Sequence, residues 1–228
     1  GGGKVILRQT DANNVVAANL YLLGGSRQIT PANAGIEALL LEVSERGTKN
    51  YPKAALRHRM SMLGSEIDAA PSDDWTMFGV HATTEVFDST WAIFADRLMN
   101  PTLDPDDVAL IKNQFLSAIR QQRDDPDALA EYLADSIAFS GHPYAIPVIG
   151  TEASIASLDA KALRDYQASQ FVKSRMLLVV VGNVDRAHVE RLVRSTLAKM
   201  PAGNYSWTAP PRLPQGKSAV AVEQRSLP

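Results

Sequence analysis

The order of strand-like and helix-like segments constrains the fold of this chain more than any other feature. Two pairs of β-rich runs are each followed by a group of amphipathic helical segments, and one strand-length apolar run, MLLVVVG, comes near the end. Strand pairs followed by helix groups are typical of proteins in which helices pack against one sheet. We therefore predict an α+β fold, in which an antiparallel β-sheet packs against a layer of α-helices.

Turn-forming residues delimit the predicted strands. The tetrapeptide DANN at 11–14 separates the first two runs and predicts an opening hairpin. A second turn, PSDD at 71–74, separates the next two runs. The predicted strands cover residues 4–9, 15–23, 66–70, 75–82 and 176–181.

Capping residues and apolar stripes at helical spacing delimit the predicted helices. Two of them begin at Asp104 and Asp125, each followed by proline, because aspartate caps a helix and proline fits its first turn. Thr30 begins the first helix in the same way, and Gly47 ends it. The predicted helices cover residues 30–46, 53–63, 87–99, 104–124, 125–139, 159–171 and 185–197.

Composition narrows the class of protein without identifying it. The 228 residues carry a net charge of −2, which gives no reason to expect nucleic acid or an anionic membrane as a partner. The longest apolar run has strand length and is too short to span a bilayer. No signal peptide is recognisable, although the first three glycines are consistent with a processing or cloning remnant. The compartment stays open between the periplasm and the cytoplasm of a bacterium.

The distribution of proline divides the chain into two regions. Residues 1–200 contain all the predicted helices and the five predicted strands. Residues 201–214 are rich in proline and are interpreted as a linker, and residues 219–223 are predicted to form the first strand of a following unit. We therefore predict one unit over residues 1–200, with residues 201–228 leading to the next.

Local motifs do not reveal an active site. The four histidines, His58, His81, His142 and His188, are too far apart in sequence to form a local metal motif, and cysteine is absent. His58 is expected on a solvated helix face, His81 half-buried in a strand, His142 in a structural loop and His188 exposed in a first helical turn. Nucleophile-elbow, dinucleotide-binding and phosphate-loop motifs are absent.

A series of short segments, in a fixed order, resembles the pitrilysin/insulinase family of zinc metallopeptidases, which includes mitochondrial processing peptidase and the core subunits of the cytochrome bc1 complex. The match extends over nearly the whole chain and resembles the first homologous unit of the family. The segments are LLGGSR at 22–27, AGI at 34–36, GT at 47–48, GSEIDA at 64–69, DDWT at 73–76, NP at 100–101, DDP at 124–126, HPY at 142–144, GT at 150–151 and VVGNV at 180–184.

The resemblance implies a zinc site that this sequence does not complete. Active members carry H-x-x-E-H on the first helix, where two histidines bind zinc and the glutamate activates water. The corresponding positions are Ala38, Leu41 and Glu42, and the position of the distal glutamate ligand is Ala118. Alanine and leucine cannot bind a metal ion, so we expect no zinc and no other cofactor. Glu42 keeps a carboxylate where the family has histidine. Glu42 and Glu45 are expected on a solvated helix face, and the lesser alternative is that the two together bind a hard cation.

The resemblance also points to a segment that binds substrate. Residues 65–71 correspond to the edge strand to which extended substrates add in the family. We predict a peptide-binding role for this segment, because strand addition uses backbone groups and does not need the zinc ligands. The alternative is an ordinary edge strand blunted by Pro71. The candidate residues are Glu66, Ile67, Asp68, Ala69 and Ala70.

These observations support one main hypothesis and two alternatives. The main hypothesis is a non-catalytic homologue of a zinc metallopeptidase that serves as the structural or peptide-binding half of a peptidase assembly. Its partner would be a second homologous unit in the same chain or a separate active subunit. The alternatives are an active zinc peptidase whose ligands lie elsewhere in the sequence, and a scaffolding subunit of a larger complex.

Overall fold

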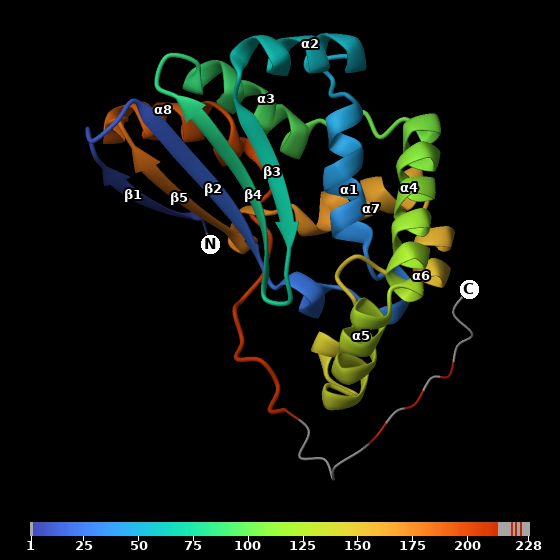
Figure 1. The fold of residues 1–228 in the computed structure, drawn as a ribbon. Helices are drawn as coiled ribbons and strands as arrows, with labels where there is room; N and C mark the ends of the chain where they lie inside the picture. Colours follow the sequence, from blue (N-terminus) through green and yellow to red (C-terminus); the bar gives the residue numbers. More distant parts are fainter. Residues whose placement is uncertain (1, 214–219, 221, 223, 225–228) are drawn as a thin grey trace.

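The computed structural model describes residues 2–213, 220, 222 and 224, and its core is a five-stranded sheet with the strand order β1-β5-β2-β4-β3. Helices pack against one face of this sheet, and further helices lie beyond its β3 edge (Figure 1). The strands are β1 (Lys4–Gln9), β2 (Val15–Leu23), β3 (Glu66–Pro71), β4 (Trp75–Thr83) and β5 (Met176–Gly182). The predicted α+β class is therefore confirmed.

Two details of the sheet differ from the prediction. The opening hairpin is wrong, because β5 lies between β1 and β2. The sheet is also mixed, since β1 and β5 run parallel while the other neighbouring pairs are antiparallel. The apolar run of β5 explains this arrangement: alternate residues Met176, Leu178 and Val180 are buried, which suits an interior strand, while β1 is largely exposed and takes the edge.

Eight α-helices are formed by the residues that the structure describes. They are α1 (Ile36–Val43), α2 (Lys53–Leu63), α3 (Phe87–Met99), α4 (Pro105–Asp124), α5 (Pro126–Ala138), α6 (Glu152–Ser157), α7 (Ala160–Gln170) and α8 (Arg186–Ser195). Asp104 and Asp125 cap α4 and α5 through their side chains, as predicted. Short α6 was not predicted, because six residues are too few to establish a helical period.

The first helix is shorter than predicted. Residues Pro31–Asn33 form only a 3₁₀ turn, and α1 begins after Gly35, which has a φ of 83°. A side chain at Gly35 would also lie 2.6 Å from the carbonyl oxygen of Ile149. Glycine is therefore required here for both reasons, and it separates the capped turn from the helix that follows.

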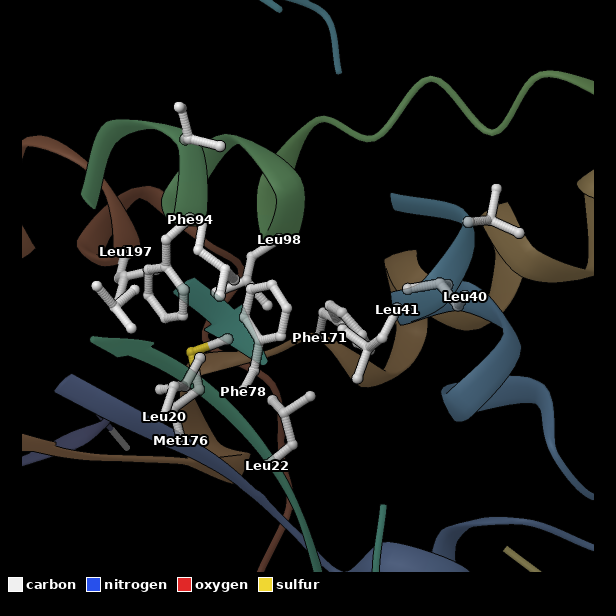
Figure 2. Close-up of a cluster of buried hydrophobic side chains, with 14 of the residues drawn as sticks. Leu20, Leu22, Leu40, Leu41, Phe78, Phe94, Leu98, Phe171, Met176 and Leu197 are labelled. Carbon is white, nitrogen blue, oxygen red and sulfur yellow. The ribbon is translucent and has the colours of Figure 1, made fainter. Parts of the chain in front are cut away.

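A single apolar core lies between the sheet and the helices (Figure 2). From the sheet, Leu20 and Leu22 of β2 and Phe78 of β4 point toward the helix layer. Phe94 of α3 stacks on Phe78, with ring centroids 4.9 Å apart. Burial of these large side chains is the main stabilising term of the fold, at about 25 cal/mol per Å² of apolar surface.

Residues 201–213 are held against the body of the protein. Residues 201–213 contain no helix or strand. The amide of Lys173 donates to the carbonyl oxygen of Pro201, and Arg27 donates to that of Thr208. The strand predicted over residues 219–223 falls largely outside the described residues. No helix in the described part of the chain is both long and apolar enough to cross a membrane.

Candidate functional site

Helix α1 carries three of the four positions at which the resemblance implies zinc chemistry. It lies between β3 and α4 and also packs against α7 (Figure 1). Every residue of α1 except Glu42 is buried. Helix α1 therefore lies almost entirely inside the protein, and Glu42 is its one exposed residue.

Ala38 and Leu41 are both buried. Ala38 is 8% exposed and Leu41 is fully buried. Leu41 belongs to the core cluster and points toward Phe171 (Figure 2). Neither side chain has an atom that can bind a metal ion or carry a proton, so α1 cannot provide the histidine and the base that the family motif requires at these positions.

Glu42 is exposed but lies in a region of opposing charges. Its carboxyl group is still partly shielded from solvent by neighbouring residues. This partial burial, followed by repulsion from Glu45, raises the pKa of Glu42 above its usual value, while Arg97 and Arg46 act in the opposite direction. Buried Arg97 donates to Glu45 Oε1 at 3.0 Å, and its guanidinium lies 5.0 Å from the ring centroid of Phe78. One carboxylate oxygen of Glu45 is therefore already engaged by an arginine.

Ala118 lies on α4, next to α1, and is exposed. The N-terminal end of α4 is tied to the chain that follows α1. There, Asp107 Oδ1 accepts hydrogen bonds from Arg46 and from Lys53. Partial burial raises the pKa of Asp107, but the two cationic donors outweigh it and hold the pKa below its usual value. The two elements that would carry zinc ligands are thus adjacent and fixed, although two of the three ligand positions hold alanine and the third holds Glu42.

Strand β3 carries the candidate peptide-binding residues. Within the described part of the chain it pairs only with β4, which makes it an edge of the sheet, and it packs beside α1. Ile67 is 7% exposed and points into the core. The other four candidates, Glu66, Asp68, Ala69 and Ala70, are exposed. The structure therefore brings β3 and α1 together.

The histidines lie apart, and most have other partners. His58 is exposed on α2, as predicted. His81 was expected to be half-buried, which is wrong: it is exposed and lies 3.5 Å from Asp68, because position 81 faces away from the helix layer. His142 is buried and accepts a hydrogen bond from the amide of Tyr144. His188 is partly exposed and lies 2.6 Å from Asp88.

The donor set does not fit a zinc ion. Among the residues that the structure describes, no group of three or more His, Cys, Asp or Glu side chains converges on one point. At the position that the resemblance identifies, Glu42 is the single potential ligand, and zinc sites in proteins have at least three. We therefore derive no metal-dependent step for this chain.

One buried polar cluster was not found from the sequence. Glu37 Oε2 accepts hydrogen bonds from Tyr166 at 2.9 Å and from Arg175 at 3.2 Å. Burial, followed by the charge of Glu37, raises the pKa of Tyr166 far above its usual value. Glu37 lies 129 residues from Tyr166 and 138 residues from Arg175 in the sequence, so no local spacing indicates that they meet. The cluster fixes α1 against α7 and the start of β5.

Comparison with known proteins identifies the family. The family model "Insulinase (Peptidase family M16)" matches residues 4–152, and the model "Peptidase M16 inactive domain" matches residues 157–226. The uncharacterized zinc protease YmxG of Bacillus subtilis is 23% identical over 83% of this chain and 46% of its own length. The mitochondrial-processing peptidase subunit beta of Blastocladiella emersonii is 25% identical over 86% of this chain and 43% of its own length.

A solved structure has the same fold. The crystal structure of a peptidase M16 inactive domain from Pseudomonas fluorescens superposes with a TM-score of 0.83 at 22% identity, over 93% of this chain and 52% of that one. The chain thus spans about half the length of the relatives that it matches. Since the first family model covers well over half of these residues, the chain belongs to peptidase family M16, the insulinase family.

Proposed function

We propose that this chain is a non-catalytic M16 unit that forms the structural or peptide-binding half of a peptidase assembly. The observation that carries the proposal is the identity of the residues at the motif positions of α1. Its two buried motif positions hold Ala38 and Leu41, side chains without a donor atom, within a helix that is otherwise intact and well packed. Retention of the fold without the ligands is expected of a unit whose role depends on shape.

Pairing with a second unit is the next part of the proposal. The chain spans about half of each relative, as expected of one unit of an M16 pair. The partner is a second homologous unit, in the same polypeptide or as a separate active subunit. Such a partner would supply the catalytic zinc that this chain has no residues to hold.

Peptide binding by β3 is the activity that we assign to the unit itself. An edge strand presents unpaired backbone N–H and C=O groups, which can add an extended peptide as a further strand. Four of the five candidate residues, Glu66, Asp68, Ala69 and Ala70, are exposed. Two of these are alanines, so a peptide backbone could approach the strand closely. A scaffolding role without peptide binding has no separate observation in its favour.

Metal content and peptidase activity of the purified chain test the proposal. After dialysis against metal-free buffer, elemental analysis should find far less than one zinc per chain, and fluorogenic peptides should not be cleaved. Glu42→Gln is the matched variant, because it removes the one carboxylate at the motif without changing its size. Stoichiometric zinc that is lost in this variant, or chelator-sensitive cleavage that survives repurification, would overturn the proposal.

A further inference from the structure

A cavity of about 730 Å³ opens where the C-terminal ends of three helices meet. Asn100, Phe171 and Thr196 are the C-cap residues of α3, α7 and α8, and all three line the cavity. None of the described residues that line it belongs to β3, α1 or α4. The cavity is therefore separate from the candidate peptide-binding strand and from the helices that carry the motif positions.

The wall of this cavity contains a buried carboxylate. Asp96 is 4% exposed and lines the cavity. Its oxygens accept hydrogen bonds from Thr48 Oγ1, from the backbone amide and the side-chain Nδ2 of Asn50, and from Asn100 Nδ2. Four donors around two oxygens suit the ionised form of a carboxyl group, which can only accept. Asp96 is thus held as an anion beside the cavity.

No described residue supplies a cation to this anion. Arg97, the next residue of α3, is buried and pairs with Glu45. The C-terminal ends of helix dipoles are negative, so the ends of α3, α7 and α8 add to the charge of Asp96. Among the described residues that line the cavity, Lys199 is the only one with a cationic side chain, and it is exposed. The electrostatic potential in the cavity therefore favours a positively charged ligand.

The other groups of the wall suit a cation that has an apolar body. Asn50 and Asn100 each donate Nδ2 to Asp96, which leaves both Oδ1 atoms able to accept from N–H groups of a ligand. Apolar side chains make up much of the remaining wall: Ala92, Ala95, Leu98, Met99, Phe171 and Met200. A bare metal ion would have no partner among these apolar groups. Cavities of this size, with apolar walls and a few convergent polar groups, are typical of small-molecule sites.

We propose that this cavity binds a small organic cation, an alkyl chain that ends in one ammonium or guanidinium group. The N–H donors of the ligand bond to Asn50 Oδ1 and Asn100 Oδ1 beside the charge of Asp96, and its alkyl chain lies against the apolar wall. A single charge is favoured, because Lys199 repels a second cationic group. This site is independent of peptide binding by β3 and of the zinc content of the chain.

NMR titration of the isotope-labelled chain with n-butylguanidinium tests the site. Saturable shift changes are expected at backbone amides within residues 50–51, 92–100, 167–171 and 195–201, which include the cavity lining. Two probes of matched shape test the charge: n-butylurea is neutral and pentanoate is an anion. Both should bind about tenfold more weakly than n-butylguanidinium, because they lack the complementary charge.

Variants then separate the cavity from general attraction to acidic surfaces. Ala168→Trp should weaken binding by about tenfold, because Ala168 is exposed on α7 and a large side chain there obstructs the cavity without entering the core. Ala134→Trp is the matched control, since Ala134 is exposed on α5 and does not line the cavity. Lys199→Gln should tighten binding about threefold by removal of a like charge. This variant tests the electrostatics without disturbing the hydrogen bonds of Asp96.

Three results would overturn the proposal. The first is the absence of saturable shifts, or shifts spread over acidic residues across the surface. The second is equal binding of n-butylurea, which would show an apolar groove without selection for charge. The third is unchanged affinity in Ala168→Trp. Zinc analysis and peptide protection are measured separately, so a failure here is distinguishable from a failure of the proposed function.

Discussion

Arg175 Nη1 lies 3.2 Å from Glu37 Oε2, and both side chains are almost completely buried. The pair connects the residue before Ala38 on α1 with the segment that leads into β5. Arg175 also donates to the carbonyl oxygens of Leu23 and Gln170, so one guanidinium joins three parts of the chain. Glu37 Oε1 and Arg175 Nη2 have no hydrogen-bond partner in the structure. The cluster therefore fixes the orientation of α1 while two of its polar atoms remain unsatisfied.

Removal of one partner of this pair should be strongly destabilising. Arg175→Met leaves the Glu37 carboxylate buried without its cation, and we expect a loss of about 3–5 kcal/mol in the free energy of unfolding. The double variant Glu37→Leu/Arg175→Met should recover much of that loss, because neither charge remains buried. Urea unfolding at neutral pH measures both. Lys161→Ala is the control, since its pair with Asp165 is exposed to solvent and contributes little to stability. A single variant as stable as the parent would show that the pair does not anchor α1.

Glu42→Gln should stabilise the protein at neutral pH. Burial and the nearby Glu45 raise the pKa of Glu42 in the folded state, so its ionised form is disfavoured on folding. A carboxyl group whose pKa is higher in the folded than in the unfolded protein contributes most to stability at pH values below its unfolded pKa, about 4.3. This contribution is lost as the pH rises through the folded pKa. The variant should therefore be more stable than the parent at pH 7, with a difference that disappears below about pH 4. Urea midpoints across this range measure the effect, and equal stability at every pH would contradict it.

Asp107→Asn should show the opposite pH dependence. Lys53 and Arg46 hold the pKa of Asp107 below its usual value, against the effect of partial burial. Its stabilising contribution is then present above the unfolded pKa of about 3.9 and is lost as pH falls through the lower folded value. The variant should be less stable than the parent at pH 7, and the two should converge at pH values below both pKa values. If the variant were destabilised by the same amount at low pH, the cause would be lost packing and not the lost charge of Asp107.

The sequence predicts what local patterns determine and misses what distant contacts determine. Caps at Asp104 and Asp125 locate α4 and α5 because the signal lies within a few residues. The hairpin prediction for 4–23 is wrong because the best partner of β1 is β5, more than 150 residues later in the chain, and no turn residue reports this.

The candidate site follows the same rule. Ala38, Leu41 and Glu42 share one helix, and their chemistry can be judged from residue type alone. Glu37, Tyr166 and Arg175 meet only in the folded chain. The contact between Ile6 and Val179 also depends on strand order, because the two residues are neighbours only when β5 lies beside β1.

Metal binding should be restorable without catalysis. The triple variant Ala38→His, Glu42→His, Ala118→Glu supplies three donor side chains on adjacent α1 and α4 and leaves Leu41 in the core. Three protein ligands are the number that zinc sites need, so we expect about one zinc per chain after dialysis. We expect no peptidase activity, because position 41 carries no base. Elemental analysis and a fluorogenic peptide assay measure the two properties. The single variant Ala118→Glu is the control and should bind no zinc.

Addition of Leu41→Glu to the triple variant should lower the free energy of unfolding, although glutamate is the residue type that serves as the base in the family motif. Leu41 is fully buried in the apolar core, and an unpaired carboxylate at such a position is strongly destabilising. The quadruple variant should therefore unfold at lower urea than the triple variant. If it were equally stable and active, α1 would be able to present position 41 to solvent, contrary to the structure.

Peptide addition to β3 should protect residues 65–71 from amide hydrogen exchange. A synthetic peptide that is unfolded in solution would hydrogen-bond to the outer backbone groups of the strand. The interior strand β5, paired on both sides, serves as the internal control and should not change. No added protection across 65–71 at saturating peptide would count decisively against a recognition role.

A pair of proline variants separates binding from folding. Along an edge strand, N–H groups alternate between the neighbouring strand and the open side, so adjacent Ala69 and Ala70 differ in direction. One of Ala69→Pro and Ala70→Pro should therefore break a bond to β4 and lower stability. The other should leave stability nearly unchanged and abolish peptide-dependent protection, because it removes only an outward donor. Retention of peptide protection in the stable variant would show that the open edge of β3 is not the binding surface.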